Sequence, residues 1–204
     1  MIELHDNDLV FAKVRPDAII PSKDDENAGY DIYANFEEDY LIIPPHKTTL
    51  IPTGIASAIN DNYYLQVHER GSTGSKGIKY SAGVIDSSYR GEIFVALTNT
   101  NSVEVIISKL TLDELATKYG ISNKYGTYIR YDLKYGEGNA YIIDSSVNTP
   151  ITEGLTAIIY SYTKAIAQLV VHEVPKMNVK EISYDELKEI PSKRGTGSLG
   201  SSGK

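Results

Sequence analysis

The 204-residue chain is predicted to fold as an all-β protein. Short runs rich in β-branched and aromatic residues recur along it, and the composition includes 16 Tyr and no Trp. Turn-forming residues such as Pro44-Pro45 and Asn60-Asp61-Asn62 separate these runs at near-regular spacing. Many short strands joined by turns favour a sandwich or a closed barrel over a sheet built from strand–helix–strand units.

Seven runs have strand character, five in the first half of the chain and two near its C-terminal end. They are Leu9–Ala12, Tyr40–Ile43, Thr49–Ile51, Ile55–Ile59, Tyr63–Val67, Ala157–Tyr160 and Ile166–Val171. Ser183–Ile190 fits a short helical turn that ends before Pro191.

Residues 81–97 predict a hairpin whose turn holds candidate catalytic and binding side chains. Ile93 and Val95 follow a polar turn and alternate with period two. The turn presents the carboxylate of Asp86 and the ring of Tyr89. A positioned carboxylate can deprotonate a water, and a ring beside it can pack against a ring-shaped substrate. An ordinary Asp-Ser turn with a Tyr that covers the sheet explains the same residues, so the turn alone leaves both interpretations open.

Three other segments contain candidate ligands. Asp31 lies inside a predicted strand, either as a structural Asp in a bulge or as a carboxylate that holds a divalent metal through water. The loop Arg70–Gly77 combines Gly, Ser and cations, which suits phosphate oxygens but is also typical of a plain loop. The tail Arg194–Lys204 is either a flexible linker or an arm whose backbone N–H groups and Arg194 side chain bind an anion.

Composition excludes several classes of site. The chain has no Cys, so thiolate metal sites and thiol nucleophiles are absent, and its four His have no metal-ligand spacing. A net charge of −7 without a basic run argues against nonspecific nucleic-acid binding. We expect no membrane span and no signal peptide, and therefore a soluble intracellular, cytoplasmic protein.

Five segments, taken in order, carry a family resemblance. They are Ala28–Asp31, Arg70–Gly74, Gly83–Glu92, Ile166–Leu169 and Arg194–Gly203. This succession resembles the five motifs of the trimeric deoxyuridine triphosphatase (dUTPase) family. The resemblance implies a distorted jelly-roll β-barrel that forms a homotrimer with active sites at subunit interfaces. It also implies a dUTP diphosphatase, which hydrolyses dUTP to dUMP and pyrophosphate with Mg²⁺, and so limits uracil in DNA.

The resemblance implies roles for individual residues. Asp86 would be the general base, Tyr89 would pack under the deoxyribose and exclude a 2′-hydroxyl, and Asp31 would hold Mg²⁺ through water. The implied substrate-binding residues are Arg70, Gly71, Ser72 and Gln168 at the phosphates, Tyr80, Gly83, Val84 and Ile85 at the uracil, and Arg194, Gly195, Leu199, Gly200 and Ser201 in an arm that closes from another subunit.

Three positions depart from the family's pattern. Gly71 stands where a hydroxyl normally meets the phosphates, so either Ser72 or Thr73 substitutes for it or turnover suffers. Leu199 replaces an aromatic residue that would stack on the uracil, which should weaken arm closure by about 1 kcal/mol. Ala165 replaces a frequent Arg just before the fourth motif.

The interval between Glu92 and Gln168 is far longer than the roughly 20–25 residues that two strands and a turn need. We therefore predict an insert with mixed α/β structure. The expected organisation is a first barrel part at 1–104, the insert at 105–153, the last barrel strands at 154–175 and a C-terminal arm at 176–204.

The insert begins with a predicted helix, with Thr111 as N-cap, Glu114 completing a capping box and Gly120 as the stop. A Tyr-rich stretch with strand character follows it. We expect this insert to pack on its own barrel. A protein-partner surface is an alternative, because tyrosines are favoured at interfaces and some staphylococcal phage dUTPases use an insert at this place to bind a repressor. That analogy concerns position alone and fits a phage or prophage origin.

Other functions compete with catalysis by the barrel. A helix-turn-helix resemblance begins at Glu114, but Gly126 interrupts the second helix and basic support is weak. A nucleotide-gated regulatory protein could use the arm as a switch and the insert as its partner surface. A dCTP deaminase, the nearest relative in fold, needs a catalytic Glu on the strand that leaves the third motif, where this chain has Ala96.

Overall fold

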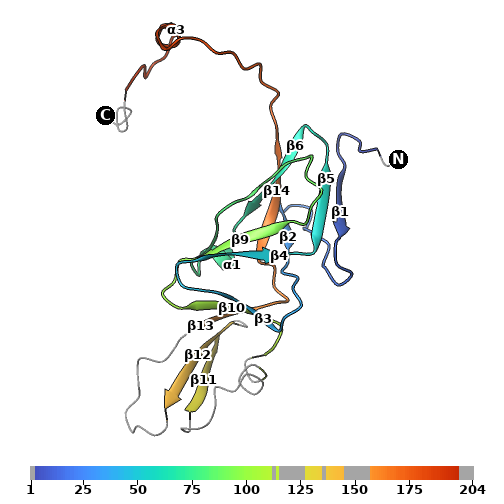
Figure 1. The fold of residues 1–204 in the computed structure, drawn as a ribbon, viewed down its shortest axis with the longest axis vertical. Helices are drawn as coiled ribbons and strands as arrows, with labels where there is room; N and C mark the ends of the chain where they lie inside the picture. Colours follow the sequence, from blue (N-terminus) through green and yellow to red (C-terminus); the bar gives the residue numbers. More distant parts are fainter. Residues whose placement is uncertain (1–2, 112–113, 115–126, 135–136, 145–156, 198–204) are drawn as a thin grey trace. The chain divides into compact units, whose positions relative to one another are not determined.

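The structure is a computed structural model that describes residues 3–111, 114, 127–134, 137–144 and 157–197. For 127–134 and 137–144 the description covers the backbone pairing. The chain divides into two units, Met1–Val174 and Pro175–Lys204. All the described strands belong to the first unit, where they form four sheets (Figure 1). No helix in the described part of the chain is long and apolar enough to cross a membrane.

A four-stranded antiparallel sheet carries most of the candidate site. Its strands are β2 (Gly29–Ile32), β14 (Ala167–Glu173), β6 (Tyr63–His68) and β8 (Val84–Ile85), in the order β2-β14-β6-β8. The first, second, third and fourth motifs are therefore attached to neighbouring strands of one sheet, although they are far apart in the sequence.

Two smaller antiparallel sheets complete the part of the barrel around this sheet. One has the order β4-β9-β7, with β4 at Thr48–Pro52, β9 at Phe94–Asn99 and β7 at Ile78–Tyr80. The other pairs β1 (Leu9–Lys13) with β5 (Ile55–Ile59) over the full length of both strands.

A five-stranded sheet joins the barrel to part of the predicted insert. Its strands, in order across the sheet, are β11 (Thr127–Lys134), β12 (Glu137–Asp144), β13 (Ala157–Ser161), β10 (Glu104–Ser108) and β3 (Tyr40–Ile43). Strands β10 and β13 pair in parallel, whereas the other neighbours are antiparallel. The predicted insert boundary at residue 105 lies inside β10, which pairs with the barrel strand β3.

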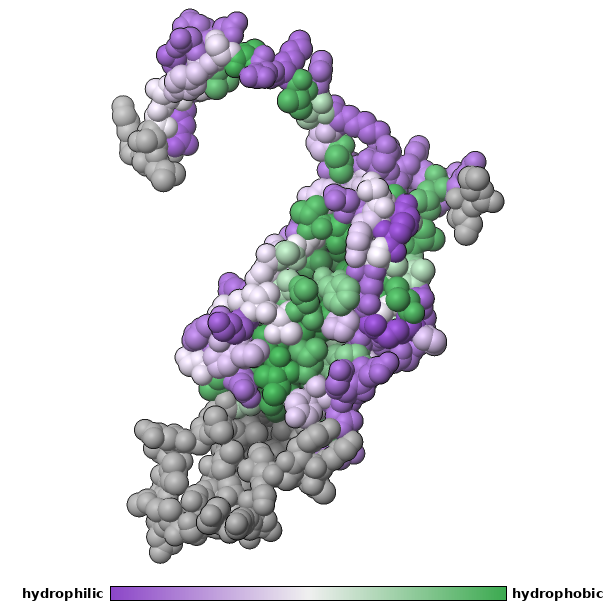
Figure 2. Space-filling model, viewed as in Figure 1, coloured by the Kyte–Doolittle hydropathy of each residue, from purple (hydrophilic) through white to green (hydrophobic). Residues whose placement is uncertain are grey.

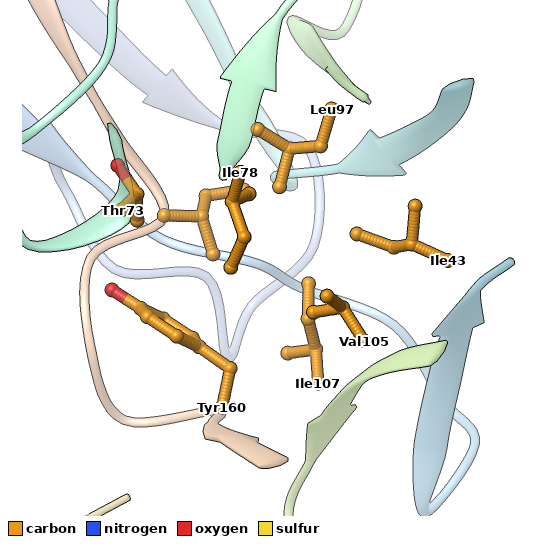
Figure 3. Close-up of a pocket in the computed structure, with 8 residues that line it drawn as sticks. Ile43, Thr73, Ile78, Leu97, Val105, Ile107 and Tyr160 are labelled. Carbon is orange, nitrogen blue, oxygen red and sulfur yellow. The ribbon is translucent and has the colours of Figure 1, made fainter. Parts of the chain in front are cut away.

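The core lies between these sheets and consists mainly of Ile, Leu and Val. Figure 3 shows one part of it, where Ile43, Ile78 and Ile107 converge with Tyr160. The space among these side chains leaves no room for a water molecule. Each fully buried aliphatic side chain contributes about 1.5–3 kcal/mol through removal of its surface from water, so this packing is the main force that holds the sheets together.

Each of the seven predicted strands is confirmed, because β1, β3, β4, β5, β6, β13 and β14 overlap the predicted runs. The short helical turn near the C-terminus is also confirmed as α3 (Tyr184–Glu189). Ser183 caps it, accepting a hydrogen bond from the Glu186 N–H at 3.2 Å.

The hairpin predicted for residues 81–97 is confirmed only at its open end, where the Ser81 N–H donates to the Ala96 carbonyl at 2.9 Å and extends the β7–β9 pairing. Strand β9 pairs with β7, and the Val84–Ile85 strand β8 pairs with β6 in a different sheet. Gly83 permits this change of sheet, because a Cβ at this position would lie 2.5 Å from Gln66 Nε2 and 3.0 Å from the Val67 carbonyl oxygen. The Gly83 carbonyl instead accepts a 2.8 Å hydrogen bond from the Val67 N–H, which extends the β6–β8 contact.

The predicted insert is described in part. Thr111 and Glu114 form the predicted capping box, in which the Thr111 N–H donates to Glu114 Oε2 at 2.8 Å and the Glu114 N–H donates to Thr111 Oγ1 at 3.3 Å. The predicted stop at Gly120 lies outside the described residues. The predicted Tyr-rich strand character is confirmed at Tyr128, Tyr131 and Tyr141, which lie in β11 and β12, while Tyr125 and Tyr135 lie outside the described residues. From Thr127 to Lys134 the chain is therefore a strand and not a recognition helix.

Candidate active site

Asp31 and Gln168 are neighbours across two strands. They are paired in the β2–β14 register, and Gln168 is also opposite His68 of β6. The Gln168 side-chain amide donates to the Glu69 carbonyl at 2.8 Å, which draws it toward the loop after β6. Gly29 leaves the space for this side chain, since a Cβ there would lie 2.5 Å from Gln168 Oε1.

Arg70 connects the second motif to the first and fourth. Its Nε lies 2.9 Å from Asp31 Oδ1, and its Nη1 donates to the Ala165 carbonyl at 3.3 Å. Both members of the ion pair are about one-third exposed, so the pair contributes only about 0–1 kcal/mol to stability. Its importance is geometric, because it holds a cation and a carboxylate side by side at a partly open edge of the sheet.

The loop after Arg70 has two hydroxyl groups in different environments. It forms the helical turn α1 (Gly71–Gly74). Thr73 is buried, and its hydroxyl accepts from the Arg70 N–H at 3.1 Å and donates to the Arg70 carbonyl at 3.0 Å. Ser72 is exposed on the same turn. Of the two hydroxyls that sequence reasoning left open as substitutes at Gly71, Ser72 is therefore the one that can meet a ligand from solvent.

Asp86 follows β8 in an exposed tight turn. Its carbonyl oxygen accepts from the Tyr89 N–H at 3.0 Å, and Arg90 Nη1 braces the turn by donating to the Ser87 carbonyl at 2.6 Å. Among the residues that the structure describes, none forms a hydrogen bond or an ion pair with the Asp86 carboxylate. This carboxylate can therefore accept a hydrogen bond from a water or a ligand.

The Tyr89 ring folds back over the end of the same turn. Its hydroxyl donates to the Glu92 carbonyl at 2.9 Å, and 45% of the residue remains exposed. The ring occupies the space that a side chain at position 91 would take, because a Cβ there would lie 2.6 Å from Tyr89 Cζ. The hydroxyl end of the side chain is thus held against the backbone of residues 91 and 92, while much of the residue is open to solvent.

Tyr80 lies at the end of β7 and contacts a row of rings that sequence reasoning did not find. Its ring meets His68 edge to face at a centroid distance of 5.8 Å. His68 stacks on His172 at 5.8 Å, and His172 stacks on Tyr64 at 5.3 Å. The sequence signal was the period of two along a strand, which places Tyr64 and His68 on one face of β6. The register then places His172 of β14, opposite Tyr64, on the same face.

The remaining predicted residues are placed as follows. Gly83, Val84 and Ile85 lie in and before β8, next to the Asp86 turn. Arg194 and Gly195 belong to the second unit, where both N–H groups donate to Ser192 Oγ at 3.2 and 3.1 Å. The predicted positions 199–201 lie outside the described residues. Within the described part of the chain no group of three or more acidic or His side chains is arranged to hold a metal.

Comparisons with known proteins extend this geometry. A sequence model of the dUTPase family matches residues 16–111. A deoxyuridine 5'-triphosphate nucleotidohydrolase from Leptospira interrogans is 35% identical over 103 residues, which cover 48% of this chain and 70% of that protein. The chain belongs to the dUTPase family. Membership accounts for the order of the motifs along the chain.

Solved dUTPase structures share the fold. A mutant dUTPase of Staphylococcus bacteriophage 80alpha, solved with dUpNHpp, is 19% identical, with a TM-score of 0.63 over 97% of this chain and 99% of that one. A mutant dUTPase from phage phi11 of S. aureus, solved to show the coordination of a structural Mg(II) ion, is 21% identical, with a TM-score of 0.57 over 86% of this chain and 97% of that one. The predicted jelly-roll-type β fold of the dUTPase family is thereby confirmed.

Proposed function

We propose that this chain hydrolyses dUTP to dUMP and pyrophosphate, with Asp86 as the general base. The observation that carries the proposal is the arrangement of one sheet, which joins the Asp31–Arg70–Gln168 cluster to the exposed Asp86 turn. A cation and amide donors suit a triphosphate, and an exposed carboxylate suits an attacking water. Membership of the family and the names of its curated relatives support the same substrate.

In the proposed reaction a water oxygen attacks the α-phosphorus and its proton passes to the Asp86 carboxylate. The bond from the α-phosphorus to the bridging oxygen breaks, and pyrophosphate leaves with the electron pair. Arg70, Ser72 and Gln168 hold the phosphates, while the β8 backbone from Gly83 to Asp86 meets the uracil. The role of the C-terminal arm, with Arg194 and the Gly-rich residues after it, stays a prediction.

The donor set fits a magnesium ion that arrives with the nucleotide. Asp31 is one partly exposed carboxylate beside Arg70 rather than part of a group of three acidic ligands in the described residues. Mg²⁺ commonly keeps several waters and binds through one or two carboxylates plus substrate phosphates, which matches a single Asp. When bound, Mg²⁺ would neutralise charge on the phosphate oxygens. Asp31 would then orient the waters of the ion, and Arg70 would direct some of its guanidinium N–H groups to the phosphates.

A homotrimer is also proposed, as is typical of the family. Apolar side chains reach the surface of the barrel (Figure 2). Leu50 of β4 and Phe94 of β9 are 63% and 46% exposed. These two strands pair in register, so both side chains belong to one exposed area of a sheet. Such an area fits burial against another copy of the chain.

The test of the activity is pyrophosphate release with Mg²⁺ from dUTP, dTTP, dCTP and UTP. We expect turnover of dUTP alone, and a loss of about 100-fold or more in Asp86→Asn, which keeps the shape of the side chain but cannot take a proton. Asp25→Asn, at an exposed aspartate, is the matched control and should behave as wild type. Turnover unchanged in Asp86→Asn would refute the assignment of the base, and pyrophosphate release from dCTP or dTTP in place of dUTP would overturn the substrate.

A second function is proposed for the insert, namely binding of a protein partner. Strand β12 extends the barrel sheet by pairing with β13, and β11 is the last strand of that sheet in the described residues. Strands at the end of a sheet present unpaired backbone groups that another chain can bind. Replacement of 127–144 by a short linker should abolish capture of the partner and leave dUTP turnover unchanged. A joint loss of both would mean that the insert supports the barrel instead.

A further inference from the structure

Tyr89 depends on its own turn for its position rather than on the core. Its hydroxyl is held by the Glu92 carbonyl at 2.9 Å, and its ring lies over Gly91. Almost half of the residue is exposed, so few other side chains restrain it. Any shift of the backbone at residues 91–92 must therefore shift the ring.

The side chain of Glu92 fixes that backbone. Its Oε1 accepts the Gly54 N–H at 2.7 Å, and Arg15 binds both carboxylate oxygens, with Nη1 3.3 Å from Oε2 and Nη2 on Oε1. Only 13% of the Glu92 side chain is exposed. This partly buried carboxylate accepts from three donor groups, two of which belong to one planar guanidinium. Such an arrangement has one favourable geometry, which the point charge of a Lys would not impose.

The donors that hold Glu92 are themselves held. Arg15 Nη2 also donates to the carbonyl of the buried residue Asn35 at 2.9 Å. Gly54 has φ of +66°, and a Cβ there would lie 2.7 Å from both Ala18 Cβ and Asn35 Oδ1. The Gly54 N–H is therefore set by a backbone conformation that favours glycine and by packing against Asn35.

We propose that Glu92 is a positioning residue that fixes Tyr89 and so sets the discrimination between deoxyribose and ribose nucleotides. The inference rests on the proposed function, in which the Tyr89 ring packs under the sugar. Rejection of a 2′-hydroxyl by a ring is a steric effect that weakens steeply when the ring moves. A displacement of about 1 Å at a site can change rates by up to about 100-fold.

The experiment measures kcat/KM for dUTP and for UTP in wild type, Glu92→Ala, Glu92→Gln and Tyr89→Phe. We expect the dUTP/UTP ratio to fall about ten-fold in Glu92→Ala, and much less in Glu92→Gln, which keeps an acceptor for Gly54 and Arg15. Tyr89→Phe should lower the same ratio, and combining it with Glu92→Ala should give less than the product of the two effects. Glu38→Ala, at an exposed glutamate, is the matched control.

A purely structural role for Glu92 predicts a different result. Both substrates would then lose rate in parallel, the ratio would stay at the wild-type value, and the inference would be overturned. If Glu92→Ala does not fold, the two nearly isosteric variants Glu92→Gln and Tyr89→Phe decide the question. Equilibrium binding of dUpNHpp and of its ribose counterpart gives the corresponding ratio of affinities without turnover. Absence of hydrolysis would therefore refute the proposed function, while the affinity ratio would still test the role of Glu92.

Discussion

Replacing Gly71 with Ser should raise activity toward dUTP. A Cβ at Gly71 would meet no heavy atom within 4 Å, and the backbone there does not need the positive φ that favours glycine. The position is exposed at the first residue of α1. Because both Ser and Ala fit, Gly71→Ala supplies the same Cβ without the hydroxyl and is the matched control.

The two effects of this substitution can be separated. A side chain in place of glycine in a helical turn stabilises by about 0.5–1 kcal/mol, and this gain is common to both variants. A hydrogen bond to a charged group contributes about 1.5–3 kcal/mol, and the lower end applies because Arg70 and Ser72 already serve the phosphates. A difference of about 1.4 kcal/mol is a ten-fold change. We therefore expect kcat/KM for dUTP in Gly71→Ser to exceed that of Gly71→Ala by about ten-fold.

The assay is steady-state pyrophosphate release by wild type and both variants, with thermal unfolding recorded in parallel. Equal kcat/KM in the Ser and Ala variants would refute the reasoning, because it would mean that no phosphate comes within reach of position 71. A drop in both variants, with melting temperature retained, would instead show that the nucleotide backbone needs the space of a glycine.

Three further outcomes follow from the structure. Tyr160→Phe removes the 2.7 Å hydrogen bond to the Ala165 carbonyl and should cost about 1 kcal/mol of unfolding free energy in a denaturant titration, whereas no change would mean that the donor at Arg70 Nη1 alone satisfies this carbonyl. Leu169→Ala, at a fully buried position of β14, should cost about 2–5 kcal/mol, and a cost below 1 kcal/mol would contradict the packed core. Hydrogen bonds from the Ser183 side chain and backbone lower the pKa of Glu186 below 4.5. The Glu186 carboxylate half of the α3 capping box is therefore fully present above that value and is lost as pH falls through the lowered pKa; amide NMR shifts at Ser183 that stay constant on acidification would refute this.

Local patterns predicted the strands well because their signals lie within a few residues. Tyr40–Ile43 and Ile55–Ile59 are apolar runs closed on both sides by turn residues, and each is a strand with those bounds. The pairing of β8 was mispredicted because adjacency in sequence favours a hairpin with β9. A partner in β6 is decided by the close approach at Gly83, which no local pattern reveals.

The site residues, like the strands, could be predicted where the signal is local, whereas their contacts could not. Family motifs identified Asp31, Arg70 and Gln168, but their contacts depend on strand register and on the turn at α1. Sequence alone left Ser72 and Thr73 equivalent, because burial of one hydroxyl depends on which side of a helical turn meets the core. The Arg15–Glu92 pair spans 77 positions and has no local signature at all.

The parallel pairing of β10 with β13 indicates where this chain can accept an inserted segment. Parallel neighbours cannot be joined by a tight turn, because the chain must travel back along the whole strand, which takes about a dozen residues or more. A connection that is already long tolerates further residues at small entropic cost, about 0.6 kcal/mol for each doubling of its length. The crossover is thus the point in the barrel where evolution can add or remove a module with least effect on folding, and β12 shows how an added segment can attach itself to the same sheet.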